Sequence, residues 1–598
     1  MNELQKLYVA RAEKFQTTAQ SLKAKYNNFS LIRLICFVAG TGAVVFLWTT
    51  FGMLAGAFSI AVFLFAFAKF VRWHLAIQRL QKHCEALSQI NRNEGRCLRN
   101  DYSALQDGAE FIDPHHPYAI DLDIFGAFSF FQYCNRTSTA IGKRRLANYL
   151  QAPAEKEVIL ERQNALAELK DKLNWRQDFQ AYGRAANDDI RHLEALEKWL
   201  NRASFVLGNK WLRMTLYAAP IWTIISLFLF IFHLPWQLAI LLLIPPGLVL
   251  QKTVSRVNQT HEETTHAEKI LAHYARLIGH IEKENFSSEM LSSLQKVFFQ
   301  NEKNAAAQMI RLSYIIRQLN VRHNFFAIFL NISVLWDLRY VYQLEKWKAG
   351  LKDHLPEWFH SLEEFEALLS LATLHFNNPE WRFPLIHEQP VLVAEALGHP
   401  LIPRESRVCN DLEIFIRSHI KLVTGSNMAG KSTFLRTVGL NIVLAMAGAP
   451  VCARKLKLPL LRVYTSMRTQ DALHESTSSF YAELKRLKFI IDSVEKRDNI
   501  FFLLDEILKG TNSNDRHAGS KALIKQLIKS NGAGIVATHD LELGKLETTA
   551  EGAIENLCME VDINENELFF DYKLRKGVSQ SFNATLLMKN MGIQVGEE

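Results

Sequence analysis

The chain has 598 residues, a formal net charge of +8 and seven cysteines. This length exceeds what one hydrophobic core can organise, so we expect several domains, or a domain with a long helical extension. The cysteines are scattered, with no CxxC pair and no histidines at metal-ligand spacing, so we expect reduced structural thiols and no metal cluster. The positive charge fits a nucleic-acid partner and a membrane protein equally well, because cytoplasmic segments beside membrane spans also carry excess Lys and Arg.

Two long runs without charged side chains dominate the N-terminal half of the chain. One lies between Arg33 and Lys69 and has about 35 residues; the other lies between Arg213 and Lys252 and has about 38 residues. Each run is long enough for two membrane spans of about 20 residues. A pair of buried core helices would keep a polar stripe, and neither run has one. The sequence therefore predicts two transmembrane hairpins, at residues 31–72 and 214–251.

Lys and Arg flank the outer ends of both uncharged runs, while the expected tips of the hairpins carry no charge. This pattern places both termini in the cytoplasm. The first run begins some thirty residues into the chain and is far longer than the apolar segment of a signal peptide, about 7–15 residues, so both hairpins should remain in the mature protein. We expect a multi-pass protein of the cytoplasmic (inner) membrane, with the lipid bilayer as one partner.

The segments around the hairpins are charged, rich in Leu, Ala, Lys and Glu, and poor in Gly and Pro. That composition is typical of long helices, so we expect an N-terminal cytoplasmic helix at 1–30 and two helical regions at 73–213 and 252–380. A further apolar stretch, Phe325 to Trp336, has only about 12 residues and contains Asn331. It predicts a buried helix rather than a fifth membrane span.

The chain changes character near Trp381, where short β-rich runs and turn signals begin. Candidate strands lie at residues 391–393, 414–416 and 420–423. The sequence thus predicts a separate C-terminal domain at 381–598.

The strongest motif is at residues 425–433, between the candidate strand at 420–423 and a helix-like run from Thr433 to Ala447. It fits the pattern G-x-x-x-x-G-K-[ST], and the strand and helix around it are the expected context. Such a loop turns its amide N–H groups and a helix N-terminus toward phosphate, Lys431 would reach the β- and γ-phosphates, and Ser432 would bind Mg²⁺. The predicted nucleotide-binding residues are Gly425, Ser426, Asn427, Met428, Ala429, Gly430, Lys431, Ser432 and Thr433.

An apolar run at residues 500–504, typical of a buried parallel strand, ends in Asp505 and Glu506. Acidic residues at the carboxyl end of such a strand can hold Mg²⁺ and orient the attacking water. We therefore assign the metal to Asp505 and the water to Glu506. The alternative is a solvated acidic turn, which the phosphate loop upstream disfavours.

A third strand at residues 534–537 ends in Thr538, His539 and Asp540. Polar side chains at this strand end could reach the γ-phosphate. On its own, His539 would more often be a structural histidine, but its place after another strand of the nucleotide fold favours a catalytic role.

These motifs together resemble those of the MutS family of DNA mismatch-repair ATPases. In that family an Asn-Met pair precedes the Gly-Lys of the phosphate loop, as Asn427 and Met428 do here. The resemblance extends over the following segments: 398–401, 410–411, 422–436, 504–507, 509–513 and 537–539 in the C-terminal part, and 121–126, 135–139 and Gly142 in the helical part.

The resemblance implies a mainly α-helical core and lever region, here with two transmembrane hairpins, followed by an α/β ABC-type P-loop ATPase domain. It also implies ATP and Mg²⁺ as cofactors, with Glu506, Lys431 and His539 as catalytic residues. Ser478 and Ser479 match the family's signature segment, which presents a helix N-terminus to the ATP of a partner subunit, so a homodimer is expected. Without the resemblance, these serines would be an ordinary helix N-cap.

The sequence also departs from the family's pattern. Ser426 and Ala429 replace the usual proline and glycine of the phosphate loop, although neither change removes a group that touches phosphate. Near Arg407 and Val408 the family often has an aromatic residue that stacks on adenine. Here the Arg407 guanidinium or Val408 would have to contact the base instead, so the affinity for the base stays open. The N-terminal mismatch-recognition domain is replaced by the first hairpin, and the second hairpin interrupts the lever helices.

The sequence thus predicts a membrane-anchored MutS-family ATPase, with the ATPase domain in the cytoplasm, that binds and hydrolyses ATP. By the resemblance, it would couple this activity to binding of duplex DNA as in mismatch repair, without selecting mismatches. The alternative from another class is an ATP-driven membrane transporter or extruder, or a switch that acts on a membrane partner.

Overall fold

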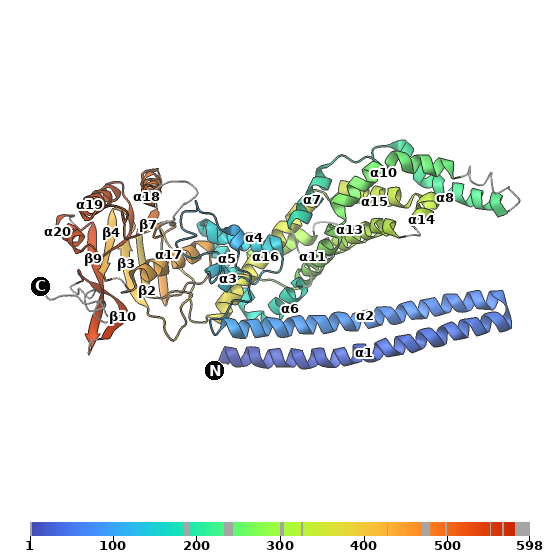
Figure 1. Cartoon of the computed structure of the whole chain (residues 1–598), viewed down its shortest axis with the longest axis horizontal. Coiled ribbons are helices and arrows are strands. Elements are labelled where there is room, and N and C mark those ends of the chain that lie inside the picture. The colour runs from blue at the N-terminus through green and yellow to red at the C-terminus, as the bar shows by residue number, and fades with distance from the viewer. Residues whose placement is uncertain are drawn as a thin grey trace.

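The computed structural model is elongated, with an α/β domain at one end and two helical arms that extend from a helical middle region (Figure 1). It describes residues 3–184, 190–231, 243–299, 304–324, 327–426, 428–468, 479–496, 499–550, 552–564 and 567–579. Within these residues every strand lies at or after Leu385. The predicted division into a helical region and a C-terminal α/β domain is therefore confirmed.

The first arm is an antiparallel pair of long helices, α1 (Glu3–Phe51) and α2 (Met53–Cys97). A single residue, Gly52, joins them with a φ of 83°, in the region that glycine adopts without steric cost. Apolar side chains are exposed along the far halves of both helices, up to 88% for Leu54. By length and composition, three described helices could cross a membrane, namely α1, α2 and α8. That they do so remains a prediction.

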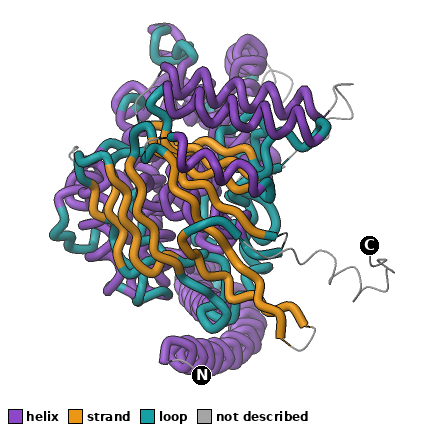
Figure 2. The backbone as a smooth tube through the Cα atoms, turned by 90° about the vertical axis from the view of Figure 1, so that its left-hand side faces the viewer, coloured by secondary structure: helices purple, strands orange, loops and turns teal. Residues whose placement is uncertain are grey.

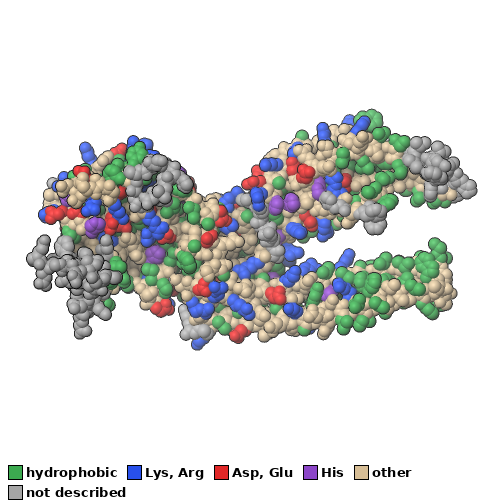
Figure 3. All heavy atoms as spheres, viewed as in Figure 1, with side chains coloured by type: hydrophobic (Ala, Val, Ile, Leu, Met, Phe, Trp, Pro, Cys, Tyr) green, Lys and Arg blue, Asp and Glu red, His purple; other side chains and the backbone are tan. Residues whose placement is uncertain are grey.

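The second arm contains the helices between residues 190 and 351. At its far end lie α8 (Lys210–Ile231) and α10 (Ile244–Thr264), and residues 232–242 between them are outside the described residues. Hydrophobic side chains gather toward the far ends of both arms, which point the same way (Figure 3). The other elements are α7 (Ile190–Asn201), α11 (Ala267–Ile281), α12 (Glu289–Lys296), η2 (Val297–Phe299), α13 (Ala305–Leu319), η3 (Asn320–His323), α14 (Ala327–Val334) and α15 (Trp336–Leu351).

The expectation of a buried helix at residues 325–336 is wrong. Within this segment, Ala327–Val334 form the short helix α14, in which Ile328 and Phe329 are each 60% exposed. The reason is its position: α14 packs against α8, α10 and α15 at the apolar end of the second arm, and it keeps one exposed side.

The middle region is built around α16 (His354–Asn377), which is buried along most of its length. Glu366 of this helix accepts hydrogen bonds from the backbone N–H and hydroxyl groups of Ser138 and Thr139, at 2.6–3.3 Å, and so caps the start of α4. Burial raises the pKa of Glu366, and these hydrogen bonds oppose the rise. The helices around α16 are η1 (Ala109–Phe111), α3 (Phe130–Cys134), α4 (Ala140–Gln151), α5 (Lys156–Asp171) and α6 (Leu173–Gly183).

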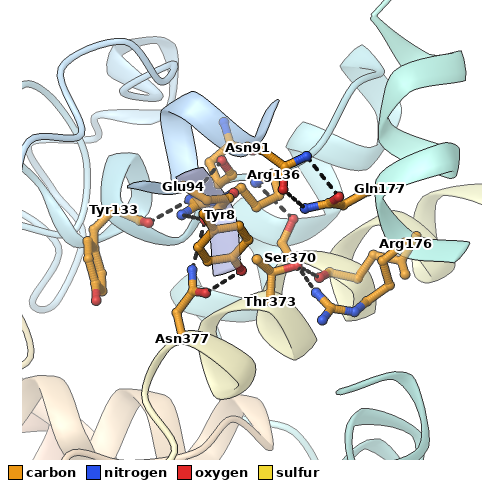
Figure 4. A network of polar contacts seen from close by, with 12 residues as sticks. Tyr8, Asn91, Glu94, Tyr133, Arg136, Arg176, Gln177, Ser370, Thr373 and Asn377 are labelled. Atoms are coloured by element: carbon orange, nitrogen blue, oxygen red, sulfur yellow. Dashed lines mark hydrogen bonds and ion pairs between the residues drawn. The ribbon is translucent and has the colours of Figure 1, made fainter. Parts of the chain in front are cut away.

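A buried polar network joins the first arm to the middle region (Figure 4). Glu94 of α2 accepts two hydrogen bonds from the Arg136 guanidinium, at 2.5 and 2.9 Å, and one from the Asn377 amide at 2.8 Å. The Tyr8 hydroxyl of α1 donates to the Asn377 carbonyl oxygen at 2.7 Å. Both helices of the first arm are thus bonded to the C-terminal end of α16, directly before the α/β domain.

The α/β domain contains a six-stranded sheet in the order β10-β9-β4-β8-β7-β6, in which only β10 is antiparallel to its neighbour (Figure 2). A second sheet has the order β1-β5-β2-β3. The predicted strands at 391–393, 414–416 and 420–423 fall in or overlap β2, β3 and β4. The strands are β1 (Leu385–Ile386), β2 (Val391–Leu397), β3 (Asn410–Phe415), β4 (His419–Gly425), β5 (Lys455–Leu458), β6 (Arg462–Ser466), β7 (Ile500–Asp505), β8 (Ala533–Thr538), β9 (Ile554–Asn564) and β10 (Glu567–Lys576).

Helices cover both faces of the six-stranded sheet. The face toward the middle region packs against α17 (Lys431–Ala447), where Leu122 of the middle region lies so close to Gly439 that an added Cβ would be 2.7 Å from its Cδ2. The opposite face packs against α18 (Ser479–Lys496) and α19 (Ser513–Lys529). Two short elements, η5 (Leu541–Lys545) and α20 (Leu546–Thr549), precede β9. The helix that follows the phosphate loop therefore lies between the sheet and the helical middle region.

Candidate nucleotide-binding site

The predicted site residues come from three neighbouring parallel strands of the six-stranded sheet. Strands β4, β8 and β7 pair in register, with Thr424 opposite Thr538 and Asp505 opposite Ala537. The carboxyl ends of these strands therefore meet at one edge of the sheet, which is where α/β proteins bind ligands. The structure brings the phosphate loop, the acidic pair and the His539 segment together there.

Two glycines of the phosphate loop occupy positions that a side chain would not tolerate. A Cβ on Gly425 would lie 2.6 Å from the Met559 carbonyl oxygen of β9. Gly430, the residue directly before α17, has a φ of 96°, in the left-handed region that favours glycine. Met428 also has a positive φ and is exposed, Ala429 is buried, and Asn427 lies outside the described residues.

Lys431 and Ser432 form the first turn of α17, so the positive end of the helix dipole faces the loop. The Lys431 ammonium is buried and donates hydrogen bonds to the carbonyl oxygens of Gly425 and Ser426, at 2.8 and 2.9 Å. Burial lowers the pKa of this ammonium, and the carboxylates of Glu506 and Asp505 oppose the shift. A buried cation and a helix N-terminus at the same point are suited to bind phosphate.

Asp505 ends β7, and its Oδ1 atom is buried with no hydrogen-bond partner among the described residues. Burial raises the pKa of Asp505, while a hydrogen bond from the Ser432 hydroxyl and the Lys509 charge oppose the rise. A divalent cation would satisfy this oxygen and stabilise the ionised form. Carboxylate and hydroxyl oxygens are hard ligands of the kind that Mg²⁺ prefers, so Ser432 and Asp505 fit a Mg²⁺ ion.

Glu506 follows Asp505 with a φ of 51°, a conformation that costs about 1–3 kcal/mol for a residue other than glycine. Its two carboxylate oxygens lie 3.3 Å from Nδ1 of His539 and 3.2 Å from Nζ of Lys509. Burial alone would raise the pKa of Glu506, but the nearby charges of Lys509 and His539 outweigh burial and lower it. The carboxylate is therefore ionised at neutral pH and able to accept a hydrogen bond from water.

A cavity of about 640 Å³ lies beside the phosphate loop and includes the backbone or side chain of Lys431, Ser432 and Glu506 in its wall. These residues contribute the charged groups of the lining. Its apolar and aromatic residues are Leu397, His399, Ile402, Val408, Phe434, Met559 and Tyr572. Polar groups suited to phosphates and apolar groups suited to a base match the two halves of a nucleotide.

The structure corrects the prediction for Arg407. Val408 lines the cavity, but Arg407 does not. The Arg407 guanidinium donates to the Ile402 carbonyl oxygen at 2.7 and 3.0 Å, and it lies over the Trp381 ring. These contacts hold the guanidinium away from the cavity, so it is not placed to stack on a base.

Of the apolar and aromatic lining residues, sequence reasoning predicted Val408 and missed the others, among them Tyr572 and His399. The Tyr572 ring lies against Gly430, with its Cδ1 atom 2.8 Å from the position of an added Cβ. Burial and the charges of Arg436 and Arg407 lower the pKa of His399 to about 4, so its ring is neutral at pH 7. His399 belongs to a segment that matched the family, whereas Tyr572 lies in the edge strand β10 with no motif around it.

The predicted signature serines are only partly described. Ser478 lies outside the described residues, and Ser479 is the first residue of α18. Near the start of this helix, the Glu483 carboxylate accepts a hydrogen bond from the Leu508 backbone N–H, which ties α18 to the segment after Glu506. Contact with a partner subunit's ATP stays a prediction.

Comparison with known proteins agrees with this geometry. Residues 421–597 match the family profile described as MutS domain V. Through this domain, the chain belongs to the MutS family. It is 34% identical to the DNA mismatch repair protein MutS of Aquifex pyrophilus over 218 residues, which is 36% of this chain and 25% of that relative. The matched MutS domain includes Lys431, Asp505, Glu506, His539 and Tyr572.

Two further relatives give the same result. The DNA mismatch repair protein MutS of Persephonella marina is 29% identical over 250 residues, or 41% of this chain and 28% of the relative. That of Thermotoga neapolitana is 30% identical over 253 residues, or 41% of this chain and 30% of the relative. The chain therefore spans less than a third of the length of these MutS relatives.

Proposed function

We propose that this MutS-family chain is a Mg²⁺-dependent ATPase anchored in the cytoplasmic membrane, and that it couples ATP hydrolysis to binding of duplex DNA. The observation that carries the ATPase proposal is that Lys431, Ser432 and Glu506 line one cavity at the carboxyl edge of the sheet, with Asp505 hydrogen-bonded to Ser432. The DNA proposal is supported by family membership and by the names of the relatives, which are DNA mismatch repair proteins.

Each residue of the nucleotide-binding site has its own role in the proposed hydrolysis of ATP. Lys431 and the N-terminus of α17 bind the β- and γ-phosphates, and Ser432 and Asp505 would hold Mg²⁺. Bound Mg²⁺ would neutralise charge on the phosphate oxygens. Glu506, kept ionised by Lys509 and His539, orients the attacking water toward the γ-phosphate. Tyr572 and Val408 lie where the base would sit.

Membrane anchoring is supported by the distribution of apolar surface. Exposed Leu, Ile, Phe and Trp side chains cover the far halves of α1 and α2 and much of α8, and leaving each in water would forgo about 1.5–3 kcal/mol. Both apolar arm ends point the same way, so a single bilayer could receive them together (Figure 3). We propose that both termini and the ATPase domain lie on the cytoplasmic side, where Lys and Arg flank the spans.

A homodimer with composite ATP sites is part of the proposal. Its support is the match of the α18 start to the MutS signature segment and the attachment of this helix to Leu508, close to Glu506. Closure of two domains around ATP and their release after hydrolysis would give two states with different positions of the arms.

A second function is favoured by one observation, the apolar ends of both arms. A MutS lever region inserted in a bilayer could act on a membrane partner or a transported substrate instead of DNA. In that case the same ATP cycle would serve as a membrane switch, transporter or extruder.

The test is the ATPase rate of the detergent-solubilised full-length protein, with Glu506→Ala as the blank. The rate would be measured without DNA, with matched duplex and with mismatched duplex, over a series of salt concentrations. We expect hydrolysis that DNA stimulates, with stimulation that fades as salt rises and no preference for mismatches. Hydrolysis that ignores every DNA would refute the DNA partnership and favour the membrane switch, and no hydrolysis above the blank would refute the ATPase.

Membrane anchoring has its own test. Membranes from cells that express the chain would be washed with alkaline carbonate, which strips peripheral proteins. We expect the protein to remain in the pellet, and release into the supernatant would contradict anchoring by spans.

A further inference from the structure

The short helix α14 lies at the apolar end of the second arm, beside α8 and α10 (Figure 1). From Asn324 to Trp336 the sequence has no charged residue. The segment is too short to cross a bilayer, and the exposure of Ile328 and Phe329 excludes a wholly buried helix. Its position therefore needs another explanation.

A hydrogen bond fixes how far α14 extends along the expected membrane span. The Thr223 hydroxyl of α8 donates to the Ser333 carbonyl oxygen at 2.6 Å. Thr223 lies ten residues beyond Arg213, after which α8 has no charged residue. Ten helical residues correspond to about 15 Å, or roughly half of a 30 Å hydrocarbon layer. If α8 spans the bilayer, the C-terminal end of α14 lies well inside the bilayer.

The backbone at this end of α14 has the internal hydrogen bonds that such a position demands. Non-helical backbone at membrane depth is tolerated only where its polar groups find partners within the protein. The Asn331 carbonyl oxygen accepts from the Leu335 N–H at 3.0 Å, and the Asn331 side chain accepts from the Asp337 N–H at 2.9 Å. Leu335, with a φ of 49°, makes the turn into α15. Asn331, which argued against a membrane location in the sequence, closes this turn.

Charged residues bound the segment on both sides. Arg322, just before α14, donates to the Asn258 side chain of α10 at 2.5 Å and pairs with Asp337 of α15 at 3.5 Å. These contacts tie the entry and exit of the segment to each other and to α10. The two charged groups that flank the uncharged α14 are thus paired with each other.

We propose that α14 and its turn into α15 form a re-entrant membrane element. The segment enters the cytoplasmic leaflet beside α8 and α10 and returns to the same side, and its exposed face, with Ile328 and Phe329, contacts lipid acyl chains. This inference rests on the proposed membrane anchoring, and it adds to the two hairpins a third contact with the bilayer. Because α15 leads to α16, the element connects the bilayer to the helix that ends at the α/β domain.

The experiment uses a photoreactive benzoylphenylalanine at one position at a time in the full-length protein, reconstituted in liposomes of defined phospholipids. Position 329, at Phe329 of α14, is the test. Two phenylalanines of nearly equal exposure are matched controls: Phe228 of the span α8 is 59% exposed, and Phe415 of the α/β domain is 58% exposed. After irradiation, mass spectrometry detects a phospholipid added to the labelled peptide.

We expect phospholipid adducts at positions 329 and 228, both at least about tenfold above position 415, because only the first two would contact hydrocarbon. Adducts at 228 without adducts at 329 would overturn the re-entrant element while membrane anchoring stands. No adduct at either position would overturn both. A crosslink from 329 to a second copy of the chain would show that α14 is a protein interface instead, and equal adducts at all three positions would also contradict the proposal.

Discussion

The Glu94 carboxylate and the Arg136 guanidinium form a buried ion pair, with side chains that are only 3% and 6% exposed. Glu94 belongs to α2 of the first arm, and Arg136 belongs to the middle region. Removal of one partner from such a pair leaves an uncompensated buried charge, which costs about 3–5 kcal/mol. The pair therefore makes the attachment of the first arm sensitive to single substitutions.

Glu94→Gln is expected to lower the apparent Tm of the solubilised protein strongly, because the Arg136 charge loses its counter-ion. The matched control is Asp101→Asn, which breaks the neighbouring pair of Arg96 and Asp101, whose side chains are 40% and 47% exposed. Solvent screens an exposed pair, so the control should shift the Tm little. Thermal unfolding at one scan rate measures both, and equal shifts would contradict the buried attachment.

Asp505→Asn separates metal binding from folding. Burial raises the pKa of Asp505 and its Oδ1 has no hydrogen-bond partner among the described residues, so a neutral amide is expected to leave the Tm of the ligand-free protein unchanged or higher. The stabilisation by ATP that depends on Mg²⁺ should be lost. Thermal shifts with ATP plus Mg²⁺ and with ATP plus EDTA measure the difference. Full Mg²⁺-dependent stabilisation in the variant would place the metal elsewhere.

Lys509→Met should change the pH dependence of hydrolysis. Burial tends to raise the pKa of Glu506, and Lys509 is the main charge that lowers it. Without that charge the pKa of Glu506 rises, so protonation removes the active carboxylate at a higher pH. The acid limb of the kcat profile is therefore expected to move to higher pH.

Lys545→Met is the control for this profile, because Lys545 forms an ion pair with Glu542 at the same i,i+3 spacing but on the exposed surface. Its acid limb should match that of the unmodified protein. A Lys509→Met profile that does not move, or moves to lower pH, would mean that Glu506 is not the group that titrates.

Tyr572→Ala is expected to weaken ATP binding about tenfold, since loss of stacking on a base costs about 1–3 kcal/mol. Tyr572→Phe should bind normally because it keeps the ring. Arg407→Met, which keeps bulk over Trp381 but changes a group outside the cavity, is the control. Equilibrium binding of a fluorescent ATP analogue gives the Kd values. Weaker binding by Arg407→Met alone would restore the expectation from the sequence.

The parts of the site that local sequence determines were predictable. The phosphate loop is one continuous motif, and Asp505 and His539 each follow a buried strand directly, so parallel pairing of β4, β7 and β8 is sufficient to bring them together. Arg407 lies in an irregular segment, where the direction of a side chain depends on tertiary contacts with Ile402 and Trp381. Tyr572 could not be predicted because its contact with Gly430 depends on the position of the edge strand β10 in the folded domain.

The helical region shows a similar limit. The length of the hydrophobic runs predicted the apolar parts of α1, α2 and α8 as helices, but not the full extent of α1 and α2. Nothing local in the sequence pairs Glu94 with Arg136, because both would be expected on solvated surfaces. For residues 325–336 the length rule allowed only a span or a buried helix, whereas α14 lies against neighbouring helices with Ile328 and Phe329 exposed.

The uninterrupted course of α2 has a mechanical consequence. With 45 residues it is roughly 68 Å long, and the Glu94 contact lies close to its C-terminal end. A rotation of about 5° at that base would displace the Gly52 end by roughly 6 Å, or about one helical turn. A small rotation at the base of the first arm, next to the α/β domain, would therefore become a sideways displacement at the Gly52 end that is as large as a side chain.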